Sequence, residues 1–190
     1  MARRAESVDE TRQRITDAAI RLHTTIGPAN TTIAGIAEEA GVTRLTVYRH
    51  FPDAAVLFEA CRGEWRARQP PPDPSTWPLI GDLEERARHA LGALYAWYGS
   101  RGDDLYPIQR DFGAIPAAAQ EELIGDGARI AEALVAGHVE PGPAGRRLRA
   151  VAGHVVSFWT WWTLVRHEGL SDAEAADVAA GFLLGSVSAR

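Results

Sequence analysis

The stretch from Thr31 to Phe51, TTIAGIAEEAGVTRLTVYRHF, decides the fold of the amino-terminal part of the chain. It contains two short segments with helical periodicity, and Gly41 separates them. Glycine permits the left-handed backbone that a tight turn between two helices requires. We therefore expect a helix-turn-helix whose two helices pack through an apolar face formed by Ile33, Ile36, Ala37, Ala40, Val42, Val47 and Phe51.

Burying that face leaves a polar face directed outward. Its members are hydrogen-bond donors, short polar groups and one apolar side chain: Thr32, Thr43, Arg44, Leu45, Thr46, Tyr48, Arg49 and His50. The guanidinium of Arg44 can bond a guanine edge through two hydrogen bonds, and Leu45 or the Thr46 methyl can meet a thymine methyl. The second helix is thus suited to reading the major groove of double-stranded DNA.

The same face offers groups for the phosphate backbone. Tyr48 and His50 can hydrogen-bond phosphate oxygens, and Thr32 and Thr43 precede helix amino termini, where backbone N–H groups favour anions. Arg49 can contact phosphate or simply be solvated, and the sequence spacing is compatible with both roles. A two-helix pattern alone is common in helical hairpins, so the DNA-binding interpretation also depends on the helix before it and the Tyr-x-His-Phe-Pro ending.

The overall amino-acid composition neither supports nor opposes the DNA-binding interpretation. The 190 residues carry a net charge of -5, and residues 1–66 are electrically neutral, with nine arginines and nine acids. The single cysteine, Cys61, excludes an internal disulfide framework and a multi-cysteine zinc site. We expect no metal and no cofactor. No run approaches the roughly 18 apolar residues of a membrane span, and we expect a cytoplasmic protein without a membrane partner.

The rest of the chain also has helical periodicity. A first helix is expected at about 9–25, ended by Gly27-Pro28, and a fourth follows Pro52-Asp53. Four prolines within residues 70–74 predict a stiff spacer. The expected domains are 1–66, a Pro-rich linker at 67–78, and a helical domain at 79–190, with helices at about 82–99, 103–112, 117–138, 144–168 and 172–188.

Together the first helix, the segment TTIAGIAEEAGVTRLTVYRHFPD and the apolar VLFEAC resemble the TetR family of bacterial transcriptional repressors, over residues 10–62. The resemblance implies an all-α fold, with an amino-terminal three-helix DNA-binding domain and a larger helical ligand-binding and dimerisation domain. It also implies a homodimer on a palindromic operator, released by a small-molecule effector. Two residues depart from the family pattern: Ala54 replaces a frequent lysine, and Leu45 replaces a frequent glycine or alanine.

The effector remains unknown from sequence, and its expected contacts are aromatic residues with a few polar ones. Pockets for small molecules are typically lined in this way. The candidates are Trp97, Arg110, Phe112, His154, Phe158 and Trp161. The alternative is that the aromatic side chains only fill the core, that His154 is an ordinary core histidine, and that Arg110 pairs with Asp111.

The last two helices are the dimer interface that the resemblance implies. Gly181 and Gly185 are four residues apart and would permit close approach of helices, and the full candidate set is Val155, Trp159, Trp162, Gly181, Phe182 and Gly185. Packing within one chain is the alternative, and the spacing does not decide which aromatic stripe faces a partner.

Two other classes of function are the alternatives to an effector-controlled regulator. An enzyme is not expected, because the six histidines are scattered and the chain has neither a phosphate-binding glycine loop nor a nucleophile elbow. The carboxylate pairs Glu84-Glu85 and Glu121-Glu122 fit solvated helix faces, and Cys61 lies on an apolar face. The third hypothesis is a regulator that acts only through protein partners, without an effector. A DNA complex that a small molecule dissociates would support the effector-controlled regulator, and catalytic turnover would support an enzyme. A DNA complex that no small molecule affects would support the regulator that acts only through protein partners.

Overall fold

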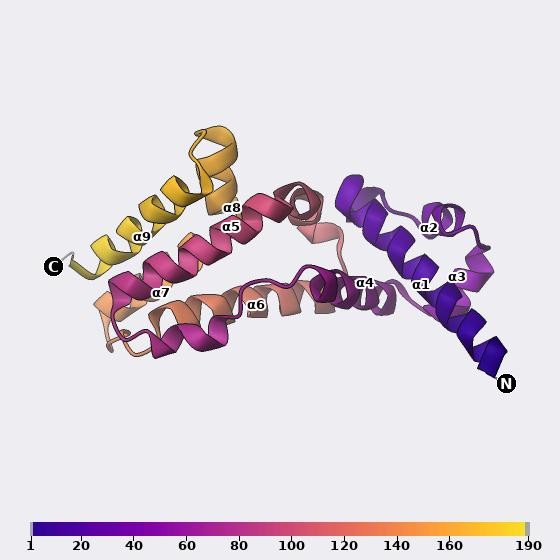
Figure 1. Cartoon of the computed structure of the whole chain (residues 1–190), viewed down its shortest axis with the longest axis horizontal. Helices are drawn as coiled ribbons and strands as arrows, with labels where there is room; N and C mark the ends of the chain where they lie inside the picture. Colours follow the sequence, from indigo (N-terminus) through magenta and orange to yellow (C-terminus); the bar gives the residue numbers. More distant parts are fainter. Residues whose placement is uncertain (1, 189–190) are drawn as a thin grey trace. The chain divides into compact units, whose positions relative to one another are not determined.

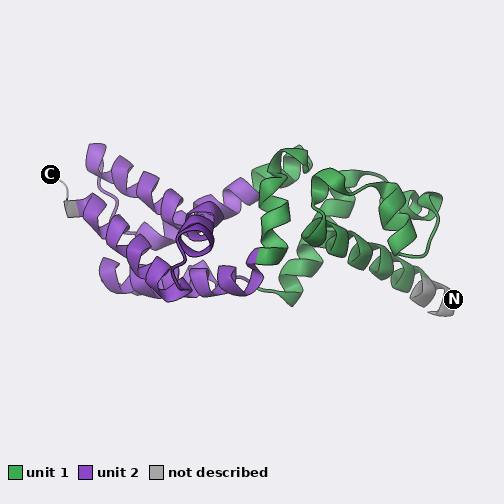
Figure 2. Ribbon diagram, turned by 90° about the horizontal axis from the view of Figure 1, so that it is seen from above, with its two compact units in different colours: residues 1–70, 103–122 green, residues 71–102, 123–190 purple. Residues whose placement is uncertain are grey.

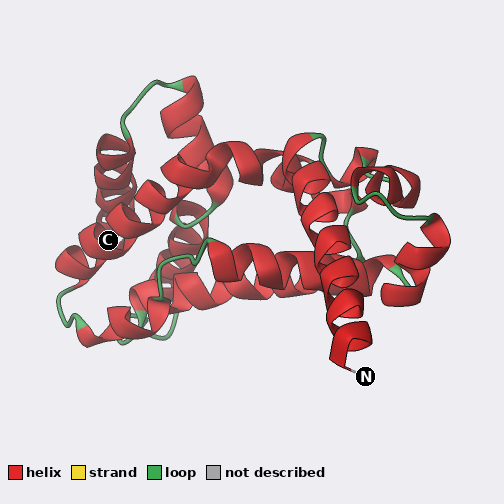
Figure 3. Ribbon diagram, turned by 45° about the vertical axis from the view of Figure 1, so that its right-hand side comes forward, coloured by secondary structure: helices red, strands yellow, loops and turns green. Residues whose placement is uncertain are grey.

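The computed structural model describes residues 2–188, and the regular elements in that range are helices (Figures 1 and 3). This confirms the expected all-α fold. In chain order the elements are α1 (Ala2–Thr25), η1 (Pro28–Asn30), α2 (Ile33–Glu39), α3 (Arg44–His50), α4 (Ala54–Arg68), η2 (Pro74–Leu79), α5 (Leu83–Arg110), η3 (Phe112–Ala114), α6 (Ala117–Val135), α7 (Pro143–Val155), α8 (Phe158–Trp162), the π-helical turn η4 (Thr163–His167) and α9 (Asp172–Ser188).

Two compact units divide the chain, as Figure 2 shows. The first contains residues 1–70 and 103–122, and the second contains residues 71–102 and 123–190. This division differs from the sequence-based boundaries, because the end of α5 and the start of α6 join the first unit. There the guanidinium of Arg62 donates to Glu122 at 2.6 Å, and that of Arg110 donates to the Ile26 carbonyl at 2.9 Å.

The core of the first unit joins α1 to the helix-turn-helix and α4. It includes all of the apolar residues predicted for the α2–α3 packing: Ile36, Ala37, Ala40, Val47 and Phe51 are buried, and Ile33 and Val42 are partly buried. The side chains of Ile15, Ala18 and Ala19 supply the α1 face. Helix α1 begins at Ala2, before the expected start near residue 9, because the residues between lack a helix breaker.

Helix α5 is continuous, and the expected separate helices at 82–99 and 103–112 are therefore wrong. Gly102 occurs where α5 meets the Trp161 ring, and a side chain on Gly99 would collide with the Asp172 carboxylate. These glycines permit close packing rather than ending the helix. Pro107 also lies inside α5, where its missing N–H removes one helical hydrogen bond. Tertiary packing here outweighs the local cost of the two glycines.

The expected helix at 144–168 is broken into α7, α8 and η4. The hydroxyl of Ser157 accepts a hydrogen bond from the Trp159 N–H and caps α8. Tyr95 and Tyr98 donate their hydroxyls to the carbonyls of Val155 and Val156, each at 2.9 Å. These two tyrosines satisfy carbonyl groups that the break removes from a regular helix.

A buried arginine organises the second unit near the start of α5. Arg86 is 2% exposed, and burial lowers the pKa of its guanidinium. It donates to the carbonyls of Ile80, Pro78 and Ala136, the shortest of these contacts being 2.6 Å. Arg86 thereby fastens the segment before α5 to the end of α6. Among the described residues, we find no helix of the length and apolarity required to cross a bilayer.

Candidate nucleic-acid interface

Side-chain hydrogen bonds cap the amino termini of both α2 and α3. The Thr32 hydroxyl accepts from the Gly35 N–H at 3.0 Å, and the Thr43 hydroxyl accepts from the Thr46 N–H at 3.2 Å. Between the helices, Gly41 has a φ of 64°, and a Cβ there would meet nothing within 4 Å. Backbone conformation rather than lack of space therefore explains the glycine, as the sequence predicted.

The outward face of α3 has the predicted composition. Leu45 is 79% exposed and Tyr48 is 51% exposed, although both are large side chains that proteins often bury. Arg44 and Arg49 are also exposed, and Thr46 and His50 are partly exposed. Helix α3 buries Val47 and leaves these neighbouring side chains in solvent. They form a contiguous surface of hydrogen-bond donors and apolar groups that can contact the groove of a DNA duplex.

The hydroxyls of Thr43 and Thr46 lie 2.9 Å apart and form a hydrogen bond with each other. Only one of the two hydroxyl hydrogens is used in that bond. The pair therefore keeps one O–H donor for an external acceptor, such as a phosphate or a base edge. Thr43 thus both caps α3 and belongs to its polar face.

Arg12 of α1 is a residue of this region that the sequence reasoning missed. Its guanidinium donates to the His50 carbonyl at 3.0 Å and lies 4.2 Å from the centroid of the Phe51 ring. It thereby satisfies a carbonyl at the end of α3. Partial burial, together with Arg49 and Arg12, lowers the pKa of His50.

The family departures noted in the sequence fall at exposed positions. Ala54 is the first residue of α4, and Asp53 before it caps that helix by accepting from the Val56 N–H at 2.9 Å. The α4 start therefore keeps its capping hydrogen bond but has no cation at residue 54 for a phosphate. Leu45 adds an exposed apolar group to α3 in the place of a small residue.

These features define a helix-turn-helix DNA-binding domain, and comparisons with known proteins agree. Residues 15–61 match the model of bacterial regulatory proteins of the tetR family. The HTH-type transcriptional regulator AcrR of Shigella flexneri is 46% identical over 59 residues, which are 30% of this chain and 27% of that protein. The HTH-type transcriptional regulator TtgR of Pseudomonas putida is 49% identical over 61 residues, or 32% of this chain and 29% of that protein.

Solved structures extend the likeness to the whole fold. A tetR-family transcriptional regulator from Streptomyces coelicolor has a TM-score of 0.66 at 20% identity, covering 95% of this chain and 81% of that one. NalD, the secondary repressor of the MexAB-OprM multidrug efflux pump in Pseudomonas aeruginosa, has a TM-score of 0.61 at 22% identity, covering 95% and 97%. At such identities the likeness concerns the fold.

The amino-terminal DNA-binding domain is therefore similar to that of the TetR family of transcriptional regulators. Its sequence matches to AcrR and TtgR span less than a third of those proteins, and they lie in the DNA-binding domain. The named relatives are regulators of transcription.

The structure separates the residues predicted for an effector site. Trp97, Phe158 and Trp161 belong to one packed aromatic cluster around Tyr98, with ring centroids 5.4 to 5.7 Å apart. Trp161 has no exposed surface, and its indole N–H donates to Asp172 at 2.8 Å. Tyr98, Phe158 and Trp161 are therefore packed core, as in the alternative given for the sequence, whereas Trp97 is partly buried.

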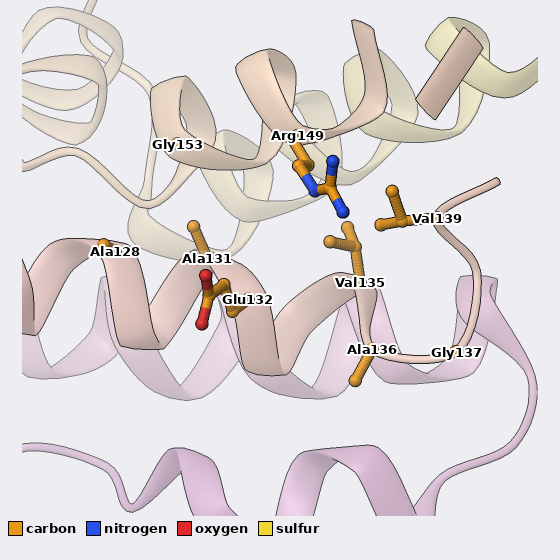
Figure 4. Close-up of a pocket in the computed structure, with 9 residues that line it drawn as sticks. All are labelled: Ala128, Ala131, Glu132, Val135, Ala136, Gly137, Val139, Arg149 and Gly153. Carbon is orange, nitrogen blue, oxygen red and sulfur yellow. The ribbon is translucent and has the colours of Figure 1, made fainter. Parts of the chain in front are cut away.

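The polar residues predicted for the effector site, Arg110 and His154, lie outside the aromatic cluster. Arg110 pairs with Asp111 at 2.7 Å in the first unit, where Phe112 also occurs. His154 is exposed on α7 and meets the Phe182 ring edge-to-face at 6.1 Å. An open groove of the second unit lies between α6 and α7, and none of the six predicted contacts lines it (Figure 4).

The residues predicted for a dimer interface are partly buried within the protomer and partly exposed on its surface. Val155 is fully buried within the protomer, so that prediction is wrong, because its side chain fills the core beneath α7. Phe182 is 54% exposed and Trp159 is 43% exposed. Gly181 and Gly185 are exposed on α9 beside Phe182, and Trp162 is partly buried. The outer side of α9 therefore exposes one large apolar side chain between two glycines.

Proposed function

We propose that this chain is a cytoplasmic transcriptional repressor that binds a palindromic operator as a homodimer and is released from it by a small-molecule effector. The observation that carries the DNA-binding part is the outward face of α3. On it, Arg44, Leu45 and Tyr48 are exposed while Val47 anchors the helix to the core. In a helix-turn-helix, that face enters the major groove.

The dimer is supported by the apolar surface of α9. Val178 and Phe182 are about half exposed, and Gly181 between them leaves room for a second helix to approach. Exposed apolar groups on one helix face lose contact with water when a symmetry-related copy covers them. A symmetric dimer would place its two α3 helices about 34–36 Å apart, in successive major grooves.

The DNA-binding proposal is tested by selecting operators from random double-stranded DNA with the purified full chain. We expect the selected sequences to converge on an inverted repeat, with a footprint that covers two half-sites one helical turn apart. The mass of the complex in sedimentation equilibrium should fit two chains on each operator. Selection of no sequence above background would overturn the proposal, and a single half-site bound by one chain would overturn the dimeric part.

Effector release is tested separately on the selected operator. A compound that binds the second unit should weaken operator binding, and the operator should weaken compound binding by the same factor. If compounds bind and leave operator affinity unchanged, the effector part of the proposal fails. Operator binding that instead depends on a protein partner would support the alternative hypothesis of a regulator that acts only through protein partners.

A further inference from the structure

A groove of about 550 Å³ lies between α6 and α7 in the second unit (Figure 4). Its walls come from the carboxyl-terminal half of α6, the turn that follows it and one side of α7. The volume falls within the range of roughly 300–1,000 Å³ that small-molecule sites occupy. The groove is therefore large enough for a small organic ligand.

Small residues create the open space. Ala128 and Ala131 line the groove from α6, and Gly153 faces them from α7. A Cβ built on Gly153 would meet nothing within 4 Å. After α6, Gly137 has a φ of 78° and turns the chain away. The helices thus leave an apolar gap that larger side chains at these positions would fill.

One cation and one anion line this apolar surface. Figure 4 shows the guanidinium of Arg149 reaching from α7 toward Val135, and the carboxylate of Glu132 nearer Ala131. Neither side chain has an ion-pair or hydrogen-bond partner among the described residues. Arginine keeps its charge in all protein environments and can bind a carboxylate through two parallel hydrogen bonds.

Two contacts hold the turn that forms one wall. Arg86 donates to the carbonyl of Ala136 at 2.6 Å, and the Nε2 atom of His138 lies 3.1 Å from the Gly81 carbonyl. Both contacts fasten residues beside Gly137 to the segment that precedes α5. A wall that is already ordered reduces the conformational entropy lost when a ligand binds.

We propose that this groove binds a small amphipathic monocarboxylate, with the carboxylate on Arg149 and the apolar body along Ala131, Val135 and Gly153. Glu132 disfavours a second negative charge in the groove, so a dicarboxylate of the same length binds more weakly. This inference rests on the proposed effector function and assigns it a place and a chemical class of ligand.

Octanoate is a suitable probe, with octanamide as its uncharged counterpart and octanedioate as its dicarboxylate. Titration calorimetry with the full chain should show saturable binding of octanoate and at least tenfold weaker binding of octanamide. Octanedioate should also bind more weakly than octanoate. Equal affinities for octanoate and octanamide would overturn the role of Arg149, and no saturable octanoate binding would overturn the site.

Two variants locate the site. Arg149→Gln should weaken octanoate binding at least tenfold and remove the preference over octanamide, while Arg146→Gln, on the same helix outside the groove, should leave both unchanged. Gly153→Leu should fill the groove and abolish binding, and Ala150→Leu is its control. Thermal unfolding followed by circular dichroism verifies that each variant is folded. Octanoate binding that survives Gly153→Leu would overturn the proposal.

The same proteins distinguish this inference from the effector function on which it rests. If octanoate binds the groove without weakening operator binding, the site stands and its role as the effector site fails. If another compound releases the operator equally from wild type and from Gly153→Leu, the repressor proposal stands and the groove is not its effector site.

Discussion

The carboxylate of Asp111 accepts a hydrogen bond from the backbone N–H of Ala29, with 3.1 Å between Oδ2 and N. Asp111 follows α5, whereas Ala29 belongs to the short turn between α1 and the helix-turn-helix. Arg110 strengthens the connection by pairing with Asp111 and by donating to the Ile26 carbonyl. Gly27, with a φ of 90°, lies against both side chains. Residues far apart in sequence thus hold the turn that leads into α2.

Replacing Asp111 should lower the melting temperature, and the loss should depend on pH. Arg110, together with the Ala29 N–H, holds the pKa of Asp111 below its ordinary value of 3.8. The charged form therefore stabilises the fold above pH 3.8, and this contribution is lost as the pH falls through the lower, folded-state pKa. In calorimetry from pH 6 to 3, Asp111→Ala should melt below wild type at pH 6 and approach it at pH 3. A difference independent of pH would contradict this account.

Arg44→Ala should reduce operator affinity and relax the choice of one base pair. Loss of an arginine that bonds a guanine through two hydrogen bonds costs about 1–3 kcal/mol of binding free energy. Fluorescence anisotropy with the selected operator and its single-base variants measures both effects. Arg146→Ala, which removes an exposed arginine from α7, is the control. Unchanged affinity and footprint for Arg44→Ala would refute the assignment.

Tyr48→Phe should weaken binding by a similar factor on every sequence. The exposed Tyr48 hydroxyl is expected to donate to a phosphate, and phosphate contacts carry no sequence information directly. Anisotropy titrations against the operator and against random duplexes compare the two losses. A loss confined to the operator would instead assign Tyr48 to base reading.

His23 should make the protein less stable as the pH falls below 6.5. Burial lowers the pKa of His23 to about 4, and its ring lies 5.4 Å from the Phe58 ring. Unfolding therefore takes up a proton between pH 6.5 and 4, and the free energy of unfolding falls in that window by up to about 1.4 kcal/mol per pH unit. Urea titrations of His23→Gln should show a shallower dependence, and those of the exposed control His167→Gln should match wild type. An unaltered slope in His23→Gln would contradict the prediction.

Phe182→Glu should convert the proposed dimer to monomers. The substitution places a charge at the centre of the exposed α9 surface, where a partner would have to desolvate it. Sedimentation equilibrium measures the change. The control, Leu79→Glu, alters a side chain that is 84% exposed but lies outside α9. Identical masses for Phe182→Glu and wild type would exclude this face as the interface.

Much of the nucleic-acid interface was predictable because its determinants are local. Gly41, the capping threonines and the apolar spacing from Ile33 to Phe51 act within a few residues of one another. Arg12 could not be identified in this way. Its contacts with His50 and Phe51 join residues 38 and 39 positions apart, and exposed arginines elsewhere in the chain look the same in sequence.

By itself, the sequence determined the all-α class, the helix-turn-helix and the outward face of α3, since helix periodicity and capping are properties of neighbouring residues. Only the tertiary structure decided how the second unit is built. It kept α5 continuous through Gly102, because packing against Trp161 compensates for weak local propensity. It also placed the aromatic cluster in the core and the open groove among alanines and glycines, since burial and empty space arise only where distant segments meet.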